Sequence, residues 1–277
     1  MKRSEELSGE SLGSLIALGR TAEVYAWGEG YVLKLYHEWF SPDRIRYEAH
    51  IAKVVREAGL SVPGVGEIVE VNGRQGLLYK QVVGPSMLET LTTRPWLLVR
   101  LARLLAELQV GMYEIEGVDG LPVQHEKLKE KIERLQLLSP ELDEAVLSVL
   151  DRLPQGSRLC HGDFHPGNIL MTEKGPVVID WIDATSGNPL ADIARTSLLM
   201  ENGQLPKGAP MRRIIDLMSG LFNKIYLRRC FQLRPWDQKE FRAWLVVNAA
   251  ARLAEGVPEE QVLLAYVQRE LAARSSS

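Results

Sequence analysis

The loop His161–Asn168, with the sequence HGDFHPGN, places a carboxylate and a carboxamide five positions apart. Its proline and two glycines allow the side chains of Asp163 and Asn168 to be presented to one point. Phosphoryl transfer needs such a pair, because a base must accept the proton of the attacking hydroxyl and hard oxygen ligands must hold Mg²⁺ against the nucleotide phosphates. We therefore interpret Asp163 as the base and Asn168 as a metal ligand, with Asp180, at the end of the next apolar run, as the second metal ligand.

The order of these residues along the chain matches the general arrangement of kinase sites. In kinases a histidine precedes the catalytic aspartate by two positions, and an asparagine follows it five positions later, the spacing of His161, Asp163 and Asn168. The arrangement also needs a lysine on the third strand that contacts the phosphates and a helix glutamate that orients it. Lys34 lies in the third expected strand and Glu48 in the helix expected to follow.

Residues 1–83 predict a small β-rich, nucleotide-binding lobe with one helix. Glycine-containing turns such as Asn72-Gly73 separate short β-branched and aromatic runs, and they favour antiparallel hairpins. Ser41-Pro42 predicts the start of the helix, because serine caps a helix and proline suits its first position. The expected strands are 15–19, 22–27, 31–36, 67–71 and 77–83.

Residues 84–277 predict a larger, mainly helical lobe. Within it, residues 158–195 hold the catalytic loop and its strand-like surroundings, and the helices of 200–277 are expected to bind the acceptor. A β-rich lobe joined to a helical lobe by a short connector predicts a ligand-binding cleft. The expected helices are 96–108, 126–138, 140–153, 212–231, 235–254 and 258–273.

These motifs resemble those of the aminoglycoside phosphotransferase and choline kinase-like superfamily. The resembling stretches are HGDFHPGNIL at 161–170, VVIDW at 177–181, GNPLADIA at 187–194 and VLKL at 32–35. The resemblance implies an α+β, two-lobed protein kinase-like fold. It also implies a small-molecule kinase that uses Mg²⁺ with ATP or GTP and has an alcohol group as its acceptor.

The resemblance implies roles for further residues. Asp192 would brace the catalytic loop, and His161 would pack under the loop without doing chemistry. The connector that contains Gln81 and Val83 would meet the adenine through its backbone, and Leu170 would lie below the adenine ring.

The sequence departs from the protein kinases in three ways, the last two of which indicate a small acceptor. The loop expected to cover the phosphates has one glycine, Gly19, so the phosphate contacts are expected to depend on Thr21, backbone amides and Lys34. Asp180 is followed by Trp-Ile and not by Phe-Gly. Gly187 comes only seven residues after Asp180, which leaves no room for a long peptide-docking segment, so a protein substrate is disfavoured.

Composition and charge exclude several classes of protein. With a net charge of −3, the chain lacks the excess of positive charge that binding to nucleic acid or to an anionic membrane requires. Cys160 and Cys230 lie far apart and are expected to be buried thiols. No apolar run is long enough for a signal peptide or a membrane span, so we expect a cytoplasmic protein. We expect it to be a monomer or a homodimer. The segment from Glu201 to Ser277 has 12 Lys and Arg against 8 Asp and Glu, which favours a neutral or anionic acceptor over a polycationic aminoglycoside.

Two other functions are alternatives to a kinase. A zinc site made by His161, Asp163 and His165 would indicate a metal-dependent hydrolase, but it needs further ligands and leaves Asn168 without a role. A nucleotide-binding pseudokinase or scaffold is disfavoured because the base, the metal ligands and the lysine are all present. Asp183 is either a third acid of the site or, as we favour, a cap or turn acid.

Overall fold

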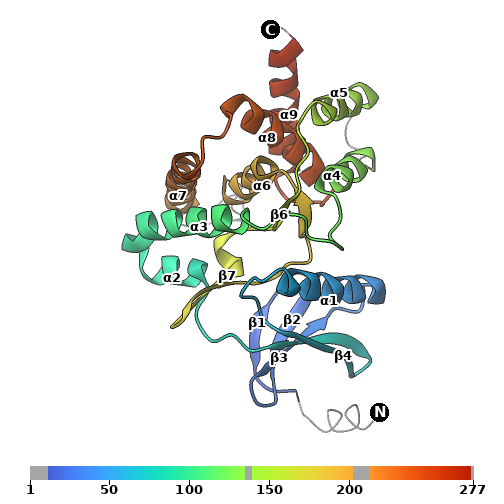
Figure 1. Cartoon of the computed structure of the whole chain (residues 1–277), viewed down its shortest axis with the longest axis vertical. Helices are drawn as coiled ribbons and strands as arrows, with labels where there is room; N and C mark the ends of the chain where they lie inside the picture. The colour runs from blue at the N-terminus through green and yellow to red at the C-terminus, as the bar shows by residue number, and fades with distance from the viewer. Residues whose placement is uncertain (1–11, 135–138, 202–211, 276–277) are drawn as a thin grey trace. The chain divides into compact units, whose positions relative to one another are not determined.

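The computed structural model describes residues 12–134, 139–201 and 212–275, which divide into two compact units (Figure 1). The first unit combines Met1–Ser86 with Ile169–Ile182. The second combines Met87–Asn168 with Asp183–Ser277. The catalytic loop therefore belongs to the second unit, and the hairpin that leads to Asp180 belongs to the first.

A five-stranded antiparallel sheet forms the centre of the first unit, in the order β1-β2-β3-β5-β4. Asn72 and Gly73 have φ angles of 53° and 78°, so they join β4 to β5 in a two-residue turn. The turn is so short that β5 starts and ends three residues before the predicted 77–83, and Val83 lies outside it. The strands are β1 (Leu15–Leu18), β2 (Ala22–Trp27), β3 (Tyr31–Tyr36), β4 (Val65–Val71) and β5 (Arg74–Lys80).

Helix α1 (Pro42–Glu57) packs on one face of this sheet. The side chain of Ser41 accepts a hydrogen bond from the Arg44 amide, as expected of a helix cap. Ile45 of α1 is buried with Tyr36, whereas Leu33 and Leu35 join a second cluster. Because strand side chains alternate between faces, Lys34 shares the α1 face with Tyr36.

A hairpin from later in the sequence completes the first unit. It consists of β7 (Ile169–Thr172) and β8 (Gly175–Val178), and the Met171 amide donates to the Pro85 carbonyl at 2.8 Å. Gly84 permits this approach, because a Cβ atom there would lie 2.3 Å from the Met171 carbonyl oxygen. Asp180 comes two residues after the end of β8.

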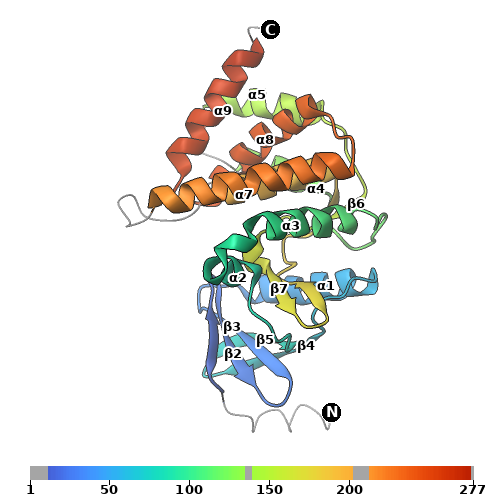
Figure 2. The ribbon, with the colours of Figure 1, turned by 90° about the vertical axis from the view of Figure 1, so that its left-hand side faces the viewer.

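The second unit is built from helices around a two-stranded sheet of β6 (Arg158–Cys160) and β9 (Thr185–Gly187). Figure 2 shows α3 and α7 side by side, and α6 packs against both α7 and α8. Cys160 and Cys230 are buried free thiols, as predicted. The helices are α2 (Met87–Thr93), α3 (Leu98–Met112), α4 (Gln124–Glu133), α5 (Pro140–Asp151), α6 (Pro189–Glu201), α7 (Arg212–Leu233), α8 (Gln238–Leu253) and α9 (Glu260–Ser275).

Two of these helices, α2 and α6, were not predicted. Helix α6 is buried on nearly every side, from Pro189 to Met200, so it lacks the alternation of polar and apolar residues that marks a surface helix. Residues 135–138, predicted to end a helix, lie outside the described part of the chain. None of the helices in the described part has the length and apolar character needed to cross a membrane.

Candidate active site

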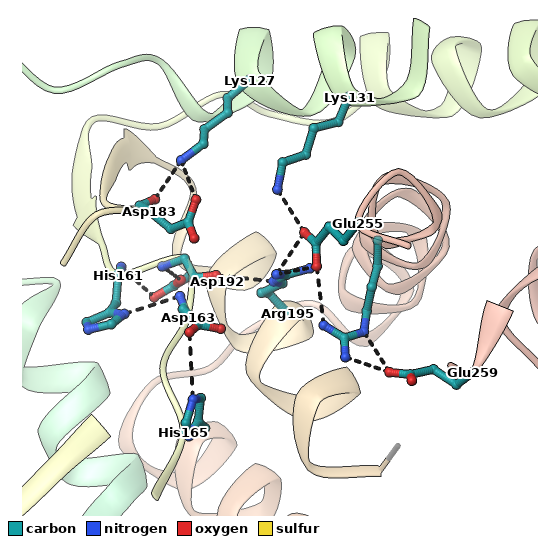
Figure 3. A network of polar contacts seen from close by, with 12 residues as sticks. Lys127, Lys131, His161, Asp163, His165, Asp183, Asp192, Arg195, Glu255 and Glu259 are labelled. Carbon is teal, nitrogen blue, oxygen red and sulfur yellow. Dashed lines mark hydrogen bonds and ion pairs between the residues drawn. The ribbon is translucent and has the colours of Figure 1, made fainter. Parts of the chain in front are cut away.

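The predicted catalytic loop follows β6 and is anchored on α6 by a buried carboxylate (Figure 3). Asp192 is 1% exposed; its Oδ1 accepts from the Gly162 amide at 2.8 Å and its Oδ2 from the His161 amide at 3.2 Å. Gln109 Nε2 and the Tyr113 hydroxyl also donate to Oδ2, each at 3.0 Å. These four hydrogen bonds satisfy a carboxylate that would otherwise be costly to bury. The loop backbone is therefore tied to the first turn of α6.

Asp163 and Asn168 lie together on this loop. Asn168 Nδ2 donates to the Asp163 carbonyl at 2.9 Å and to Asp163 Oδ2 at 3.3 Å. Since this contact uses the amide nitrogen, the carboxamide oxygen is the atom that could ligate a metal. The Asp163 amide donates to Nδ1 of His161, which is fully buried, at 3.2 Å.

The surroundings of Asp163 favour its ionised form. Burial alone would raise the pKa of this carboxyl, but the contact with His165 and the positive charge of Arg195 lower it more. The His165 Nε2 atom is 3.7 Å from Asp163 Oδ2, an electrostatic contact that is too long for a hydrogen bond. The net pKa of Asp163 is below its usual value, so the group is a carboxylate at neutral pH.

The first unit brings Lys34, Glu48 and Asp180 together. Lys34 Nζ lies 2.7 Å from Glu48 Oε1 and 3.1 Å from Asp180 Oδ1. Glu48 is only 2% exposed, and the Tyr79 hydroxyl also donates to its Oε1 at 2.9 Å. Burial lowers the pKa of Lys34, but the carboxylates of Asp180 and Glu48 raise it more, so the net pKa is above its usual value. Lys34 is therefore held as a cation.

Asp180 has a φ angle of 63°, in the left-handed region that few residues other than glycine adopt. Such strain is found preferentially at functional sites, because the surrounding structure has to stabilise it. The Asp180 side chain is 37% exposed. A partly exposed carboxylate, as in Asp180, and a carboxamide oxygen, as in Asn168, are each the kind of donor that suits Mg²⁺.

The remaining predicted nucleotide contacts lie in the first unit. The Gln81 amide donates to the Gly30 carbonyl at 2.9 Å, so that N–H is already in use. Val83 is 76% exposed, and its backbone groups make no hydrogen bond within the described residues. Leu170 is half-buried in β7, and the Thr21 carbonyl accepts from the His37 amide at 3.0 Å. Of the two connector residues, Val83 is thus the one whose backbone N–H could pair with a base.

The alternative zinc site is not assembled. His161 Nδ1 accepts from the Asp163 amide, and His165 Nδ1 accepts from the Gly167 amide at 3.0 Å. Within the described ranges, no group of three or more His, Cys, Asp or Glu side chains is placed to hold a metal ion. The hydrolase interpretation therefore loses its ligand set.

An ion-pair network beside the loop was missed by the sequence analysis (Figure 3). Asp183, expected to be a cap or turn acid, pairs with Lys127 of α4 at 2.8 Å. Glu255, just beyond α8, pairs with Arg195 at 2.9 Å and with Lys131 at 2.8 Å. These partners are far apart in the sequence, and charged residues on helices usually indicate a solvated face. The one available signal was the position of Arg195, three residues after the motif aspartate and so on the same helical face.

A family profile described as the phosphotransferase enzyme family, APH, matches residues 13–217. The chain belongs to this phosphotransferase family. The match covers well over half of the sequence and includes every predicted site residue. No curated protein sequence matches the phosphotransferase significantly.

Solved structures with similar folds cover nearly the whole phosphotransferase. One is an aminoglycoside phosphotransferase, APH(4)-Ia, in a ternary complex with AMP-PNP and hygromycin B; the TM-score is 0.63 and the identity 16%, over 97% of this chain and 94% of that one. An amicoumacin kinase in complex with AMP-PNP, Ca²⁺ and Ami has a TM-score of 0.58 and 16% identity, over 99% and 94%. A choline/ethanolamine kinase family protein from Mesorhizobium loti has a TM-score of 0.56 and 16% identity, over 100% and 90%. These findings confirm the predicted resemblance and the kinase-like fold.

Proposed function

We propose that this phosphotransferase moves the γ-phosphoryl group of ATP or GTP to a hydroxyl group of a small molecule, with Mg²⁺ as cofactor and Asp163 as base. The observation that carries the proposal is the contact between Asp163 and Asn168 on a loop fixed by Asp192. The nucleotide and small-molecule complexes of the structural neighbours support it, because those proteins share the fold.

Asp163 acts mainly by orienting the acceptor. Its lowered pKa makes it a weak base, so its carboxylate aligns the attacking hydroxyl and takes the proton only when the new P–O bond is forming. A loose transition state for phosphoryl transfer suits this role, because catalysis then depends on positioning and on stabilising charge. The hydrogen bond from Asn168 holds the Asp163 carboxylate in place.

The negative charge of the nucleotide phosphates is compensated by Lys34 and by the metal that Asp180 and Asn168 would hold. Lys34 is fixed by Glu48, which leaves its ammonium group oriented to donate to phosphate oxygens. Asp180 and Asn168 are the residues that would hold Mg²⁺. When bound, Mg²⁺ neutralises charge on the phosphate oxygens.

The charges beside the loop favour a neutral or anionic acceptor. A polycationic acceptor needs carboxylates that are free to pair with its ammonium groups. Asp183 is already paired with Lys127, and Glu255 is paired with Arg195 and Lys131. Lys127, Lys131, Asp183 and Arg195 line a cavity of about 40 Å³ next to Gly162. An added ammonium group would have to displace a lysine or arginine there, whereas a neutral polyol would not.

A panel of hydroxylated compounds tests the proposal by coupled detection of ADP or GDP release. Sugars, sugar acids and amino alcohols are assayed beside aminoglycosides, and turnover is expected for a neutral or anionic compound. A strong preference for aminoglycosides would contradict the acceptor assignment. An increase in thermal stability with Mg-nucleotide, but no turnover on any compound, would favour a pseudokinase.

A further inference from the structure

Two side chains of helix α6, Asp192 and Arg195, hold the backbone of Gly162 from both sides. Asp192 Oδ1 accepts from the Gly162 amide at 2.8 Å, and Arg195 Nε donates to the Gly162 carbonyl at 3.1 Å. The two side chains are three residues apart and therefore lie on the same helical face. The carbonyl bonded by Arg195 belongs to the peptide that joins Gly162 to Asp163. The N–H of that same peptide donates to His161 Nδ1, so both of its polar groups are engaged.

Arg195 is itself held from another part of the second unit. Its Nη2 donates to Glu255 Oε2 at 2.9 Å and lies 2.9 Å from Oε1 of the same carboxylate. Lys131 of α4 approaches Glu255 at 2.8 Å. Burial raises the pKa of Glu255, but Arg195 and Lys131 lower it more, so the carboxylate stays charged. The Arg195 and Glu255 side chains are only 11% and 16% exposed, which limits screening by water.

We propose that Arg195 is a positioning residue of the phosphoryl-transfer reaction. It fixes the Gly162–Asp163 peptide through the Gly162 carbonyl, and Glu255 fixes Arg195. The proposal deepens the proposed function and rests on it for the role of Asp163 as the base. A guanidinium group suits this task, because its Nε and Nη atoms donate in different directions from a rigid plane. A lysine has one ammonium group, which cannot take the positions of both Nε, next to the Gly162 carbonyl, and Nη2, next to Glu255.

Arg252 provides a matched control. It lies on α8, its side chain is 4% exposed, and it contacts the same carboxylate of Glu255 at 3.4 Å. Its main partner is Glu259, to which Nε donates at 3.1 Å. Within the described residues, Arg252 makes no hydrogen bond or ion pair with the catalytic loop. The same substitution at positions 195 and 252 thus removes a buried arginine in both cases. Only at position 195 does it also remove a hydrogen bond to the catalytic loop.

The experiment compares R195K and R195M with R252K and R252M, using an acceptor on which the wild type turns over. We expect R195K to lower kcat by about 10- to 100-fold, because small misplacements of a reacting group have effects of this size. The KM for the nucleotide should stay within about two-fold. R252K should leave kcat within about two-fold even where its Tm falls as far as that of R195K.

Hydrogen exchange of the peptide covering 161–168 separates this proposal from the proposed function, because it needs no acceptor. Exchange should be faster in R195K and R195M and unchanged in R252K and R252M. A wild type without turnover would refute the proposed function, and the exchange data would still decide the role of Arg195. If R195M does not fold, R195K decides. Equal losses of kcat in R195K and R252K, or unchanged loop exchange in R195K, would overturn the proposal.

Discussion

Replacing Asp192 by Asn should release the catalytic loop and destabilise the second unit. An asparagine has one acceptor oxygen in place of two. With this oxygen in the place of Oδ2, it keeps the bonds from His161, Gln109 and Tyr113, but its NH₂ group then faces the Gly162 N–H. The opposite orientation loses three bonds and is worse.

The expected loss in free energy of unfolding is worked out for the asparagine orientation that loses fewer hydrogen bonds. Losing one hydrogen bond to a charged acceptor costs about 1.5–3 kcal/mol, and leaving the Gly162 N–H unsatisfied adds to that cost. We expect a total of about 2–4 kcal/mol in the free energy of unfolding. A domain of this size loses roughly 2–4 °C in Tm for each kcal/mol, so Tm should fall by about 4–16 °C.

Urea unfolding followed by tryptophan fluorescence measures this change as a shift of the midpoint. D183N is the control, because Asp183 makes a partly exposed ion pair with Lys127, for which less than about 1 kcal/mol is expected. The reasoning would be refuted if D192N were no less stable than D183N. In that case the buried carboxylate would not anchor the loop.

Further predictions concern the nucleotide, the metal and pH. K34M should leave the buried carboxylate of Glu48 without its ammonium partner, so urea titration should show a loss of about 3–5 kcal/mol in the free energy of unfolding. Nucleotide titration of K34M should show a higher Kd, and E48Q should raise this Kd less. Chelation by EDTA should abolish turnover and added Mg²⁺ should restore it, and D180N should weaken Mg-nucleotide binding in calorimetry. Because the pKa of Asp163 is lower in the folded state, its contribution to stability should be complete above the usual carboxyl pKa of about 4 and be lost as the pH falls further; a D163N variant with the same acid unfolding curve would contradict this.

Local signals predicted the strands of the five-stranded sheet and helix α1 well. The Asn72-Gly73 turn determines the β4–β5 register, and strand alternation places Lys34 on the face that α1 covers. The ion pair of Lys34 with Glu48 follows from the order of strand and helix alone, because α1 packs directly on that face. The predicted start of β5 was three residues too late, because the two-residue turn before the strand is shorter than expected.

The second unit was harder to predict, because its informative features depend on packing between distant segments. Helix α6 is buried on nearly all sides, so its sequence lacks the period by which surface helices are recognised. Arg195 and Glu255 are 60 residues apart, and neither has a neighbour in sequence that indicates their pairing. Asp183 looked like a turn residue because Lys127 reaches it from α4, a helix more than fifty residues earlier.

The central claim is that Asp163 acts as the base in transfer of a phosphoryl group to an acceptor hydroxyl. Phosphorus NMR of wild type and D163N, with saturating Mg-ATP and an accepted compound, tests it most directly. The wild type should convert the γ-phosphate of ATP into a phosphate monoester, and D163N should form it about 10²- to 10⁴-fold more slowly while binding ATP with unchanged affinity. A D163N variant that forms the monoester at the wild-type rate, or a wild type that forms only inorganic phosphate, would contradict the claim.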